Sequence, residues 1–309
     1  MNMAIGNGIR GMIIGSAGDL TYSVKRGEQV ISARVEKMTN PRTPAQMTQR
    51  IKFPNIVALY RSLRPFLGEC FDQPRRKSSR GLAPIYNRFI GLNLLSLPAY
   101  LTRTEYATGY CIAAPYQISD GSLPAILTRS SGSDTLTDIF LGDLQLTPDT
   151  PVSQFSLAVI RHNPLYLPGD SLLHLDLLQY ADPATGVPLV SAHLYTVTLD
   201  PADTRPLRSV TPSIGFSSIS SYLARPATPD TACPSNEKSP DIACLSHEKS
   251  PDPCAFAWIH TRLTPEGLQA SPQRLILHNP LFQLYNSDTA RARALHSYDA
   301  RPIPVAPSD

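Results

Sequence analysis

The spacing of hydrophobic positions divides the chain into three stretches. Residues 10–36 alternate between apolar and polar side chains around a turn at residues 25–28, which is the pattern of a β-hairpin. From Met47 to Leu63 the apolar residues recur at helical spacing, and beyond residue 105 they recur at every second position. The pattern therefore predicts a hairpin, then helices, then a body built of strands.

The stretch after the hairpin carries the signals of a helix start. Thr43 is a good N-cap, Pro44 suits the first helical position, and Gln46 stands where a capping box places its glutamine. Pro54 interrupts the same pattern, because proline lacks the amide that the helical ladder needs. We expect the helix to kink or split there, and a second helix to cover residues 82–96.

The period of two beyond residue 105 predicts a β-rich body. Turn signals such as "SDG", "HNP" and "DPATG" separate the alternating runs. In one run, Phe155, Leu157 and Val159 share a face. Short strands with hairpin-length connections favour an antiparallel sandwich or barrel. The expected strands are residues 108–117, 122–129, 137–142, 152–161, 171–180, 189–199, 254–263 and 273–278.

Composition agrees with a mainly β fold. The 309 residues include 30 prolines and 17 glycines, and proline gathers in turns and at strand edges. We therefore expect a hairpin and two helices in residues 1–104, followed by an antiparallel β-sandwich, in one or two parts, in residues 105–309. There is no apolar run long enough to span a membrane and no start typical of a secretory signal. The expected location is the cytoplasm or a virion-like particle.

Charge is distributed unevenly along the chain. Residues 1–90 hold 15 basic and 5 acidic side chains, whereas residues 91–309 hold 13 basic and 20 acidic ones. A basic N-terminal part joined to an acidic remainder suggests either a polyanionic partner or contact between copies of the chain.

One stretch has the letters of a serine esterase motif. Residues 169–172 read Gly-Asp-Ser-Leu, but no aspartate in the chain is followed three positions later by the histidine that would activate Ser171. The motif is better interpreted as a turn that opens a strand. His174 and Asp176 share one face of that strand and are interpreted as a surface pair. We expect no enzyme, no catalytic residue and no cofactor.

Residues 228–254 are successive copies of an 11-residue unit rich in proline, serine and charge. Such a composition cannot build a core, so we interpret it as an expanded surface loop. Its three cysteines and one histidine fit no common zinc spacing, and no metal site is predicted. The five cysteines of the chain form no disulfide framework, so we expect buried or free thiols.

Basic residues in the first ninety positions allow a second interpretation, in which the chain binds nucleic acid and Tyr22 or Tyr60 stacks on bases. A third is a surface β-sandwich that binds another molecule. The densest basic cluster is Arg75, Arg76, Lys77 and Arg80, and further basic residues are Arg42, Arg50, Lys52, Arg61 and Arg64.

The most distinctive stretch is residues 15–53, where a glycine-punctuated hairpin leads into "TNPRTPAQMTQRIKF". This opening resembles that of an uncharacterised family of Bacteroidota proteins, some of which are associated with phages and prophages. The later "YNRFIGLN" and "SDTARARALHSYD" are similar to further landmarks of that family, whereas the 11-residue repeat departs from it. The family has no established activity, so no catalytic residue is carried over.

Our leading hypothesis is a non-enzymatic structural or assembly protein, phage-like in style, that associates with copies of itself through an N-terminal arm (residues 1–40). A hairpin is too small to be stable alone, so the arm must lie on another surface. The residues expected to hold it there are Asn40, Arg42, Thr43, Gln46 and Arg50.

Overall fold

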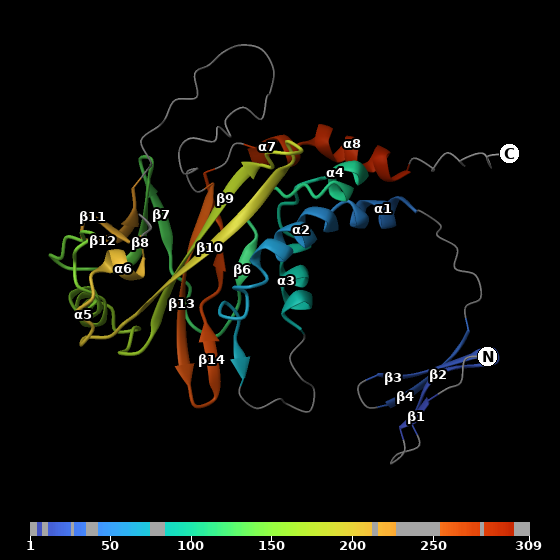
Figure 1. Cartoon of the computed structure of the whole chain (residues 1–309), viewed down its shortest axis with the longest axis horizontal. Helices are drawn as coiled ribbons and strands as arrows, with labels where there is room; N and C mark the ends of the chain where they lie inside the picture. Colours follow the sequence, from blue (N-terminus) through green and yellow to red (C-terminus); the bar gives the residue numbers. More distant parts are fainter. Residues whose placement is uncertain are drawn as a thin grey trace, which may run out of the picture. The chain divides into compact units, whose positions relative to one another are not determined.

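The computed structural model describes residues 5–7, 12–25, 28–34, 43–74, 84–211, 216–226, 254–278 and 281–299. These residues fall into two compact units, one that ends at Thr43 and one that begins at Pro44. Each unit is described by itself below, with its elements labelled as in Figure 1.

The first unit contains the N-terminal arm, which is a four-stranded antiparallel sheet with the strands in chain order. Lys25 pairs with Glu28, which confirms the predicted hairpin, and two more strands extend it. Gly18 has φ +56° at the turn before the hairpin, a conformation that glycine adopts without strain. The strands are β1 (Ile5–Asn7), β2 (Met12–Ala17), β3 (Leu20–Lys25) and β4 (Glu28–Ala33).

The second unit begins with the helices that the sequence predicts. Helix α1 (Pro44–Arg50) starts at the expected proline, and α2 (Phe53–Leu63) starts next to Pro54, so the helix is split there. Helix α3 (Ile85–Asn93) lies within the predicted range of 82–96. The other helices are α4 (Arg103–Ala107), α5 (Val152–His162), α6 (Leu207–Val210), α7 (Leu281–Tyr285) and α8 (Asp288–Asp299). Within the described part of the chain, none of these helices has the length and apolar character that a membrane span requires.

All strands of this unit that pair into sheets do so antiparallel, which confirms the mainly β fold class. The central sheet has the order β10-β9-β13-β14-β5, with β16 also paired to β13. Its strands are β5 (Gln73–Pro74), β9 (Ser171–Ala181), β10 (Pro188–Thr198), β13 (Ala255–Thr264), β14 (Gly267–Ala270) and β16 (Ile276–Leu277). A second sheet, in the order β11-β12-β8-β7, consists of β7 (Thr128–Ser131), β8 (Asp134–Phe140), β11 (Ser217–Ile219) and β12 (Tyr222–Arg225). A two-stranded sheet pairs β6 (Gln117–Ser119) with β15 (Gln273–Arg274).

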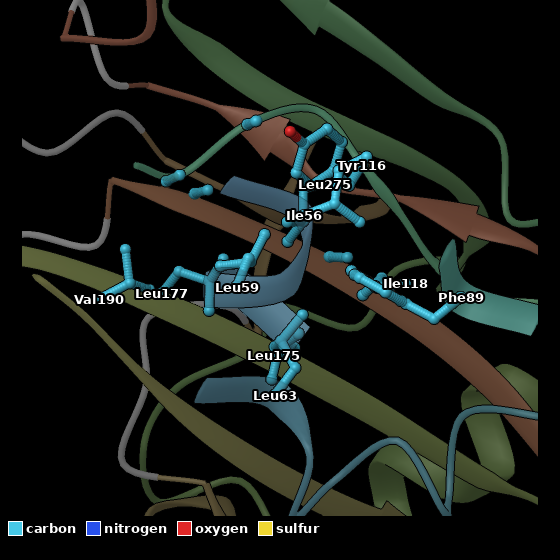
Figure 2. Packing of buried hydrophobic residues seen from close by; sticks show 14 of the residues in the cluster. Ile56, Leu59, Leu63, Phe89, Tyr116, Ile118, Leu175, Leu177, Val190 and Leu275 are labelled. Atoms are coloured by element: carbon cyan, nitrogen blue, oxygen red, sulfur yellow. The ribbon is translucent and has the colours of Figure 1, made fainter. Parts of the chain in front are cut away.

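The central sheet is covered on both faces. On one face, Leu175 and Leu177 of β9 pack with Ile56 and Leu59 of α2 and with Phe89 of α3 (Figure 2). On the other face lies a second core, to which the central sheet, the second sheet and α5 all contribute. Its buried members include Phe155, Leu172, Leu223, Phe256 and Trp258.

The predicted strand at 152–161 is wrong, because these residues form helix α5. Phe155 and Val159 are buried, but Leu157 between them is 53% exposed. Val152, Phe155 and Val159 also fit the spacing of one helical face, and tertiary packing selects that period.

The predicted strand at 108–117 is also absent, except for its last residue in β6. Side-chain amides take the place of a neighbouring strand here. Asn55 accepts from the amide of Ile112 at 2.8 Å and donates to its carbonyl at 2.8 Å. Gln179 accepts from the amide of Ala113 at 2.9 Å, and it donates to the carbonyl of Cys111 at 2.8 Å. These bonds satisfy a buried backbone without a β-ladder.

The compact units do not divide at the predicted boundary of residue 104. Helices α2 and α3 share their core with β9 and β13, so they belong to the same unit as the strands. The apolar faces of these helices are buried only against the sheet, which is why the helical part cannot be a separate domain.

Candidate functional site

Most of the residues predicted to hold the arm or to form the basic cluster lie outside the residues that the structure describes. Asn40 and Arg42, and the basic cluster Arg75, Arg76, Lys77 and Arg80, lie outside the described residues, as does most of the repeat at 228–254. Thr43, at the end of the first unit, is exposed, as are Gln46 and Arg50 at the start of the second. Arg50 Nη1 lies 3.9 Å from Met47 Sδ.

One face of the arm is more apolar than the other. The register places Leu20, Tyr22, Val24 and Ile31 on the same face, whereas the opposite face combines Ile14 and Val30 with serine, threonine and charged residues. No described side chain of the arm is buried, and Leu20 and Ile31 are 41% and 57% exposed. An amphipathic sheet normally covers its apolar face, so this face is a candidate interaction surface.

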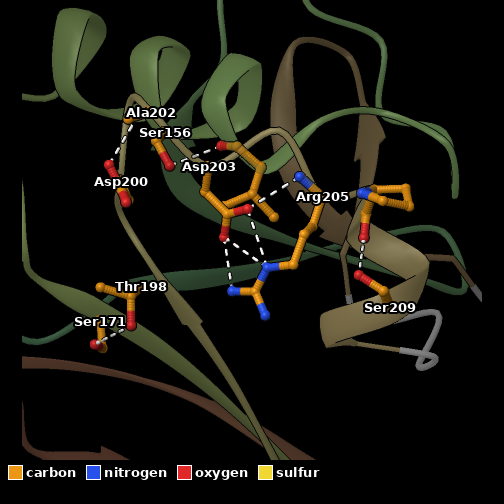
Figure 3. Close-up of polar contacts among 10 residues, drawn as sticks. Ser156, Ser171, Thr198, Asp200, Ala202, Asp203, Arg205 and Ser209 are labelled. Carbon is orange, nitrogen blue, oxygen red and sulfur yellow. Dashed lines mark hydrogen bonds and ion pairs between the residues drawn. The ribbon is translucent and has the colours of Figure 1, made fainter.

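The esterase-like Ser171 begins a strand, as interpreted from the sequence. It opens β9, and its hydroxyl lies 3.2 Å from the hydroxyl of Thr198 on β10 (Figure 3). The preceding Gly169 has φ +89°, which is the geometry of a turn. No hydrogen bond joins Ser171 to a histidine within the described residues, so nothing in this part of the structure activates it as a nucleophile.

The interpretation of His174 and Asp176 as a surface pair is wrong, because both are buried between the two sheets. His174 Nε2 lies 3.0 Å from Asp176 Oδ1, and the guanidinium of Arg225 on β12 bonds the same carboxylate oxygen. The Arg225 guanidinium also lies 4.3 Å from the ring centroid of Phe256. The strand alternation correctly placed His174 and Asp176 on one face, but only the fold shows that Arg225 meets them there.

The electrostatics of this buried network favour a charged carboxylate and a neutral imidazole. Burial lowers the pKa of His174 against the opposing effect of Asp176. Burial alone would raise the pKa of Asp176, but His174 and Arg225 hold it well below its usual range. Because the group is closed to solvent, it is suited to joining the sheets and not to acid–base chemistry.

A second network, also of one aspartate, one histidine and one arginine, joins Asp170, just before β9, to His260 and Arg262 of β13. Asp170 accepts from Arg262 Nε at 2.8 Å and from the amide of Leu167 at 2.8 Å. His260 Nε2 lies 2.8 Å from Asp170 Oδ2, and an ionised carboxylate can only accept, so Nε2 carries the proton. Burial lowers the pKa of His260, and the ring of Tyr166 stands 4.4 Å from its ring.

A hollow of about 180 Å³ lies over this second network. Its lining includes the side chains of Asp138, His162, Tyr166 and His260. An imidazole oriented by a carboxylate can transfer protons. However, no serine, threonine, cysteine or lysine lines the hollow, and its volume is below the range usual for substrate pockets. The hollow therefore has titratable side chains but no hydroxyl of serine or threonine, thiol or amine that His260 could activate.

The described residues give little evidence of a metal site or of a reactive thiol. No group of three or more histidine, cysteine, aspartate or glutamate side chains there is placed to hold a metal ion. Cys70, Cys111 and Cys254 are free and buried, and burial raises the pKa of each thiol to about 12. Such thiols are unreactive at neutral pH.

A second hollow, also of about 180 Å³, lies where α2 meets the central sheet. Residues of α2, of the segment around α4 and of strands β9 and β10 line it. The guanidinium of Arg61 lies 6.0 Å from the ring centroid of Tyr106 at this site. The lining residues are Ala58, Arg61, Ser62, Tyr106, Gly109, Tyr110, Cys111, Tyr180, Leu189 and Val190.

Comparison with known proteins does not assign the chain to a family. No family model matches the sequence, and no curated protein or solved structure shows significant similarity to the chain.

Proposed function

We propose that this chain is a non-enzymatic structural or assembly protein that associates with copies of itself through its N-terminal arm. The observation that carries the proposal is the apolar face of the arm, on which Leu20, Tyr22, Val24 and Ile31 gather without being buried. Burying such side chains stabilises an assembly by roughly 25 cal/mol per Å² of apolar surface.

Charge supports a second copy as the partner. The first 43 residues hold six basic and three acidic side chains, whereas residues 91–309 hold 13 basic and 20 acidic ones. A basic arm and an acidic remainder of the chain attract each other between copies. The buried network of His174, Asp176 and Arg225 is compatible with a structural role, since it joins residues of two sheets and is closed to solvent.

The test compares the mass of the full-length protein in solution with that of a variant lacking residues 1–40, by size-exclusion chromatography with light scattering. We expect the full-length protein to form multimers and the truncated protein to be monomeric. The truncation should leave the second unit folded, because every side chain buried among the described residues lies at Met47 or beyond. A full-length protein that is monomeric at high concentration would refute the proposal.

Ile31→Glu provides a finer test, with Ser32→Glu as its matched control. Both residues are exposed on β4, but Ile31 lies on the apolar face and Ser32 on the opposite face. We expect Ile31→Glu to weaken association strongly and Ser32→Glu to change it little. Equal effects of the two substitutions would show that the apolar face is not the contact surface.

Nucleic-acid binding is the second candidate. Arg61 and Arg64 are exposed at α2, and neither forms an ion pair with a carboxylate in the described residues. Binding to single-stranded DNA that weakens steeply with added salt and is lost in an Arg61→Ser/Arg64→Ser variant would favour it. Absence of binding at low salt would remove it.

A further inference from the structure

One edge strand of the central sheet lacks the features that usually prevent a strand of another molecule from pairing with it. Its edge strand β5 is only two residues long and ends in a proline. The opposite edge strand, β10, is 11 residues long and pairs with β9 in unbroken register along its whole length. Natural proteins protect such edges with charges, prolines or bulges. Strand β10 has no charged residue, no bulge and no proline beyond its first position.

Among the described residues, no strand pairs with the outer side of β10. From Val190 to Val197, no residue forms a backbone hydrogen bond to any described segment other than β9. The middle of the strand is also accessible, since every residue from Ser191 to Thr196 is partly or fully exposed. An edge of this kind accepts an added strand.

The side chains of β10 show which face an added sheet would continue. Its register with β9 places Val190, Ala192 and Leu194 on the face that packs against the helices. A sheet with one apolar face can extend β10 only if that face lies on the same side. The hollow at Arg61 and Tyr106 is lined by Leu189 and Val190, near the start of this edge strand.

The N-terminal arm has the features that this edge requires. Strand β4 is an edge strand of the arm and has six residues, the same number as the exposed stretch of β10. On the more apolar face of the arm, Ile31 belongs to β4 itself. Arg34 directly follows β4 and aspartates at 182 and 200 flank β10, so the charge at this end of β4 is complementary to β10, whereas the other end begins with Glu28.

We propose that the arm of one copy pairs its edge strand β4 with edge strand β10 of a second copy, so that the central sheet continues from one molecule into the next. This inference rests on the proposed function and specifies the acceptor surface for it. The apolar face of the arm then continues the helix-facing side of β10, on which Ala192 and Leu194 lie. Since donor and acceptor are different surfaces, each copy can donate one arm and accept another, which produces chains or rings.

Crosslinking between two singly labelled proteins tests the pairing. Ser32→Cys and His193→Cys are made in separate proteins, both in a background in which Cys233 and Cys244 are replaced by serine. Both positions are exposed, and the proposed pairing places them on the same side of the joined sheet. The described native cysteines are buried and should not react. A short bismaleimide crosslinker tolerates small differences in register.

We expect the mixture of the two proteins to give a crosslinked dimer, and each protein alone to give none under the same conditions. A control mixture uses Ser130→Cys, on the exposed strand β7 of the second sheet, in place of His193→Cys, and should give no dimer.

Four results would overturn the inference. Crosslinking of the His193→Cys protein with itself would show that β10 pairs with another β10. An internal crosslink in a monomeric Ser32→Cys/His193→Cys protein would show that the arm pairs with its own chain. If the mixture gives no crosslink although light scattering shows arm-dependent multimers, the arm docks elsewhere, and the proposed function stands without this acceptor. If the full-length protein is monomeric, both fail.

Discussion

The buried network at Arg225 gives the most direct test of how the two sheets are held together. Asp176→Asn removes the only carboxylate that forms an ion pair with Arg225 in the described chain, but it keeps the shape of the side chain. Arg225 is 4% exposed, so its charge stays buried after the substitution. Removing one partner of a buried ion pair costs about 3–5 kcal/mol, because the other charge is left uncompensated.

That loss is large against the roughly 5–15 kcal/mol by which domains are usually stable. Urea unfolding followed by circular dichroism and by fluorescence of Trp258 should show a clearly lower midpoint for Asp176→Asn. Trp258 is a suitable probe because its ring lies 5.3 Å from that of His174. Asp203→Asn is the matched control, since it breaks an ion pair of 2.8 Å to an arginine that is 68% exposed (Figure 3). Exposed pairs contribute little, so its midpoint should be almost unchanged.

A double substitution separates charge from packing. Arg225→Met combined with Asp176→Asn removes both charges and keeps an apolar side chain over Phe256. We expect this double variant to be more stable than Asp176→Asn alone, because the uncompensated cation is gone. Two results would contradict this reasoning. One is an Asp176→Asn variant that unfolds at the same urea concentration as the control. The other is a double variant whose loss of stability equals the sum of the losses for Asp176→Asn and Arg225→Met made singly.

Two further predictions concern stability. Asn55→Ala leaves the buried amide and carbonyl of Ile112 without their hydrogen-bond partner, which should cost about 1–3 kcal/mol of stability for each unsatisfied group. Asn87→Ala, on the exposed side of α3, is the control and should have little effect. Thermal unfolding of the two variants tests this, and equal melting temperatures would contradict it. Burial lowers the pKa values of His174 and His260 in the folded chain. Below the ordinary pKa of 6.5, the two histidines therefore bind more protons in the unfolded chain than in the folded one. The stability that is present above this pH is lost as the pH falls through it. Urea midpoints measured from neutral pH to about pH 5 should therefore decrease, and a flat profile across this range would contradict the burial of neutral imidazoles.

The candidate site was predictable from sequence only where its residues are close together in the chain. The alternation of β9 places His174 and Asp176 on one face, and two polar residues within "LLHLDLL" are a signal that they need a buried partner. Arg225 lies 49 positions away from Asp176, on a strand of another sheet, and no local pattern points to it. Asp170, His260 and Arg262 are brought together in the same way, by strand pairing and not by spacing.

The sequence by itself determined the local structure wherever a residue's own chemistry dictates it. The hairpin pairs Lys25 with Glu28, as the alternation of its side chains predicts. The helix is split next to Pro54, because proline limits the backbone regardless of context. The fold class follows from the same local signals.

Only the tertiary structure decided what depends on contacts between distant segments. Residues 152–162 are compatible with either period and became a helix because Phe155 and Val159 fit the core between the sheets. The segment at residues 111–114 looks like a strand, but its backbone is satisfied by Asn55 and Gln179. The physical reason is common to both cases, since a local pattern fixes which conformations a segment can adopt, and burial and hydrogen bonding across the fold select one of them.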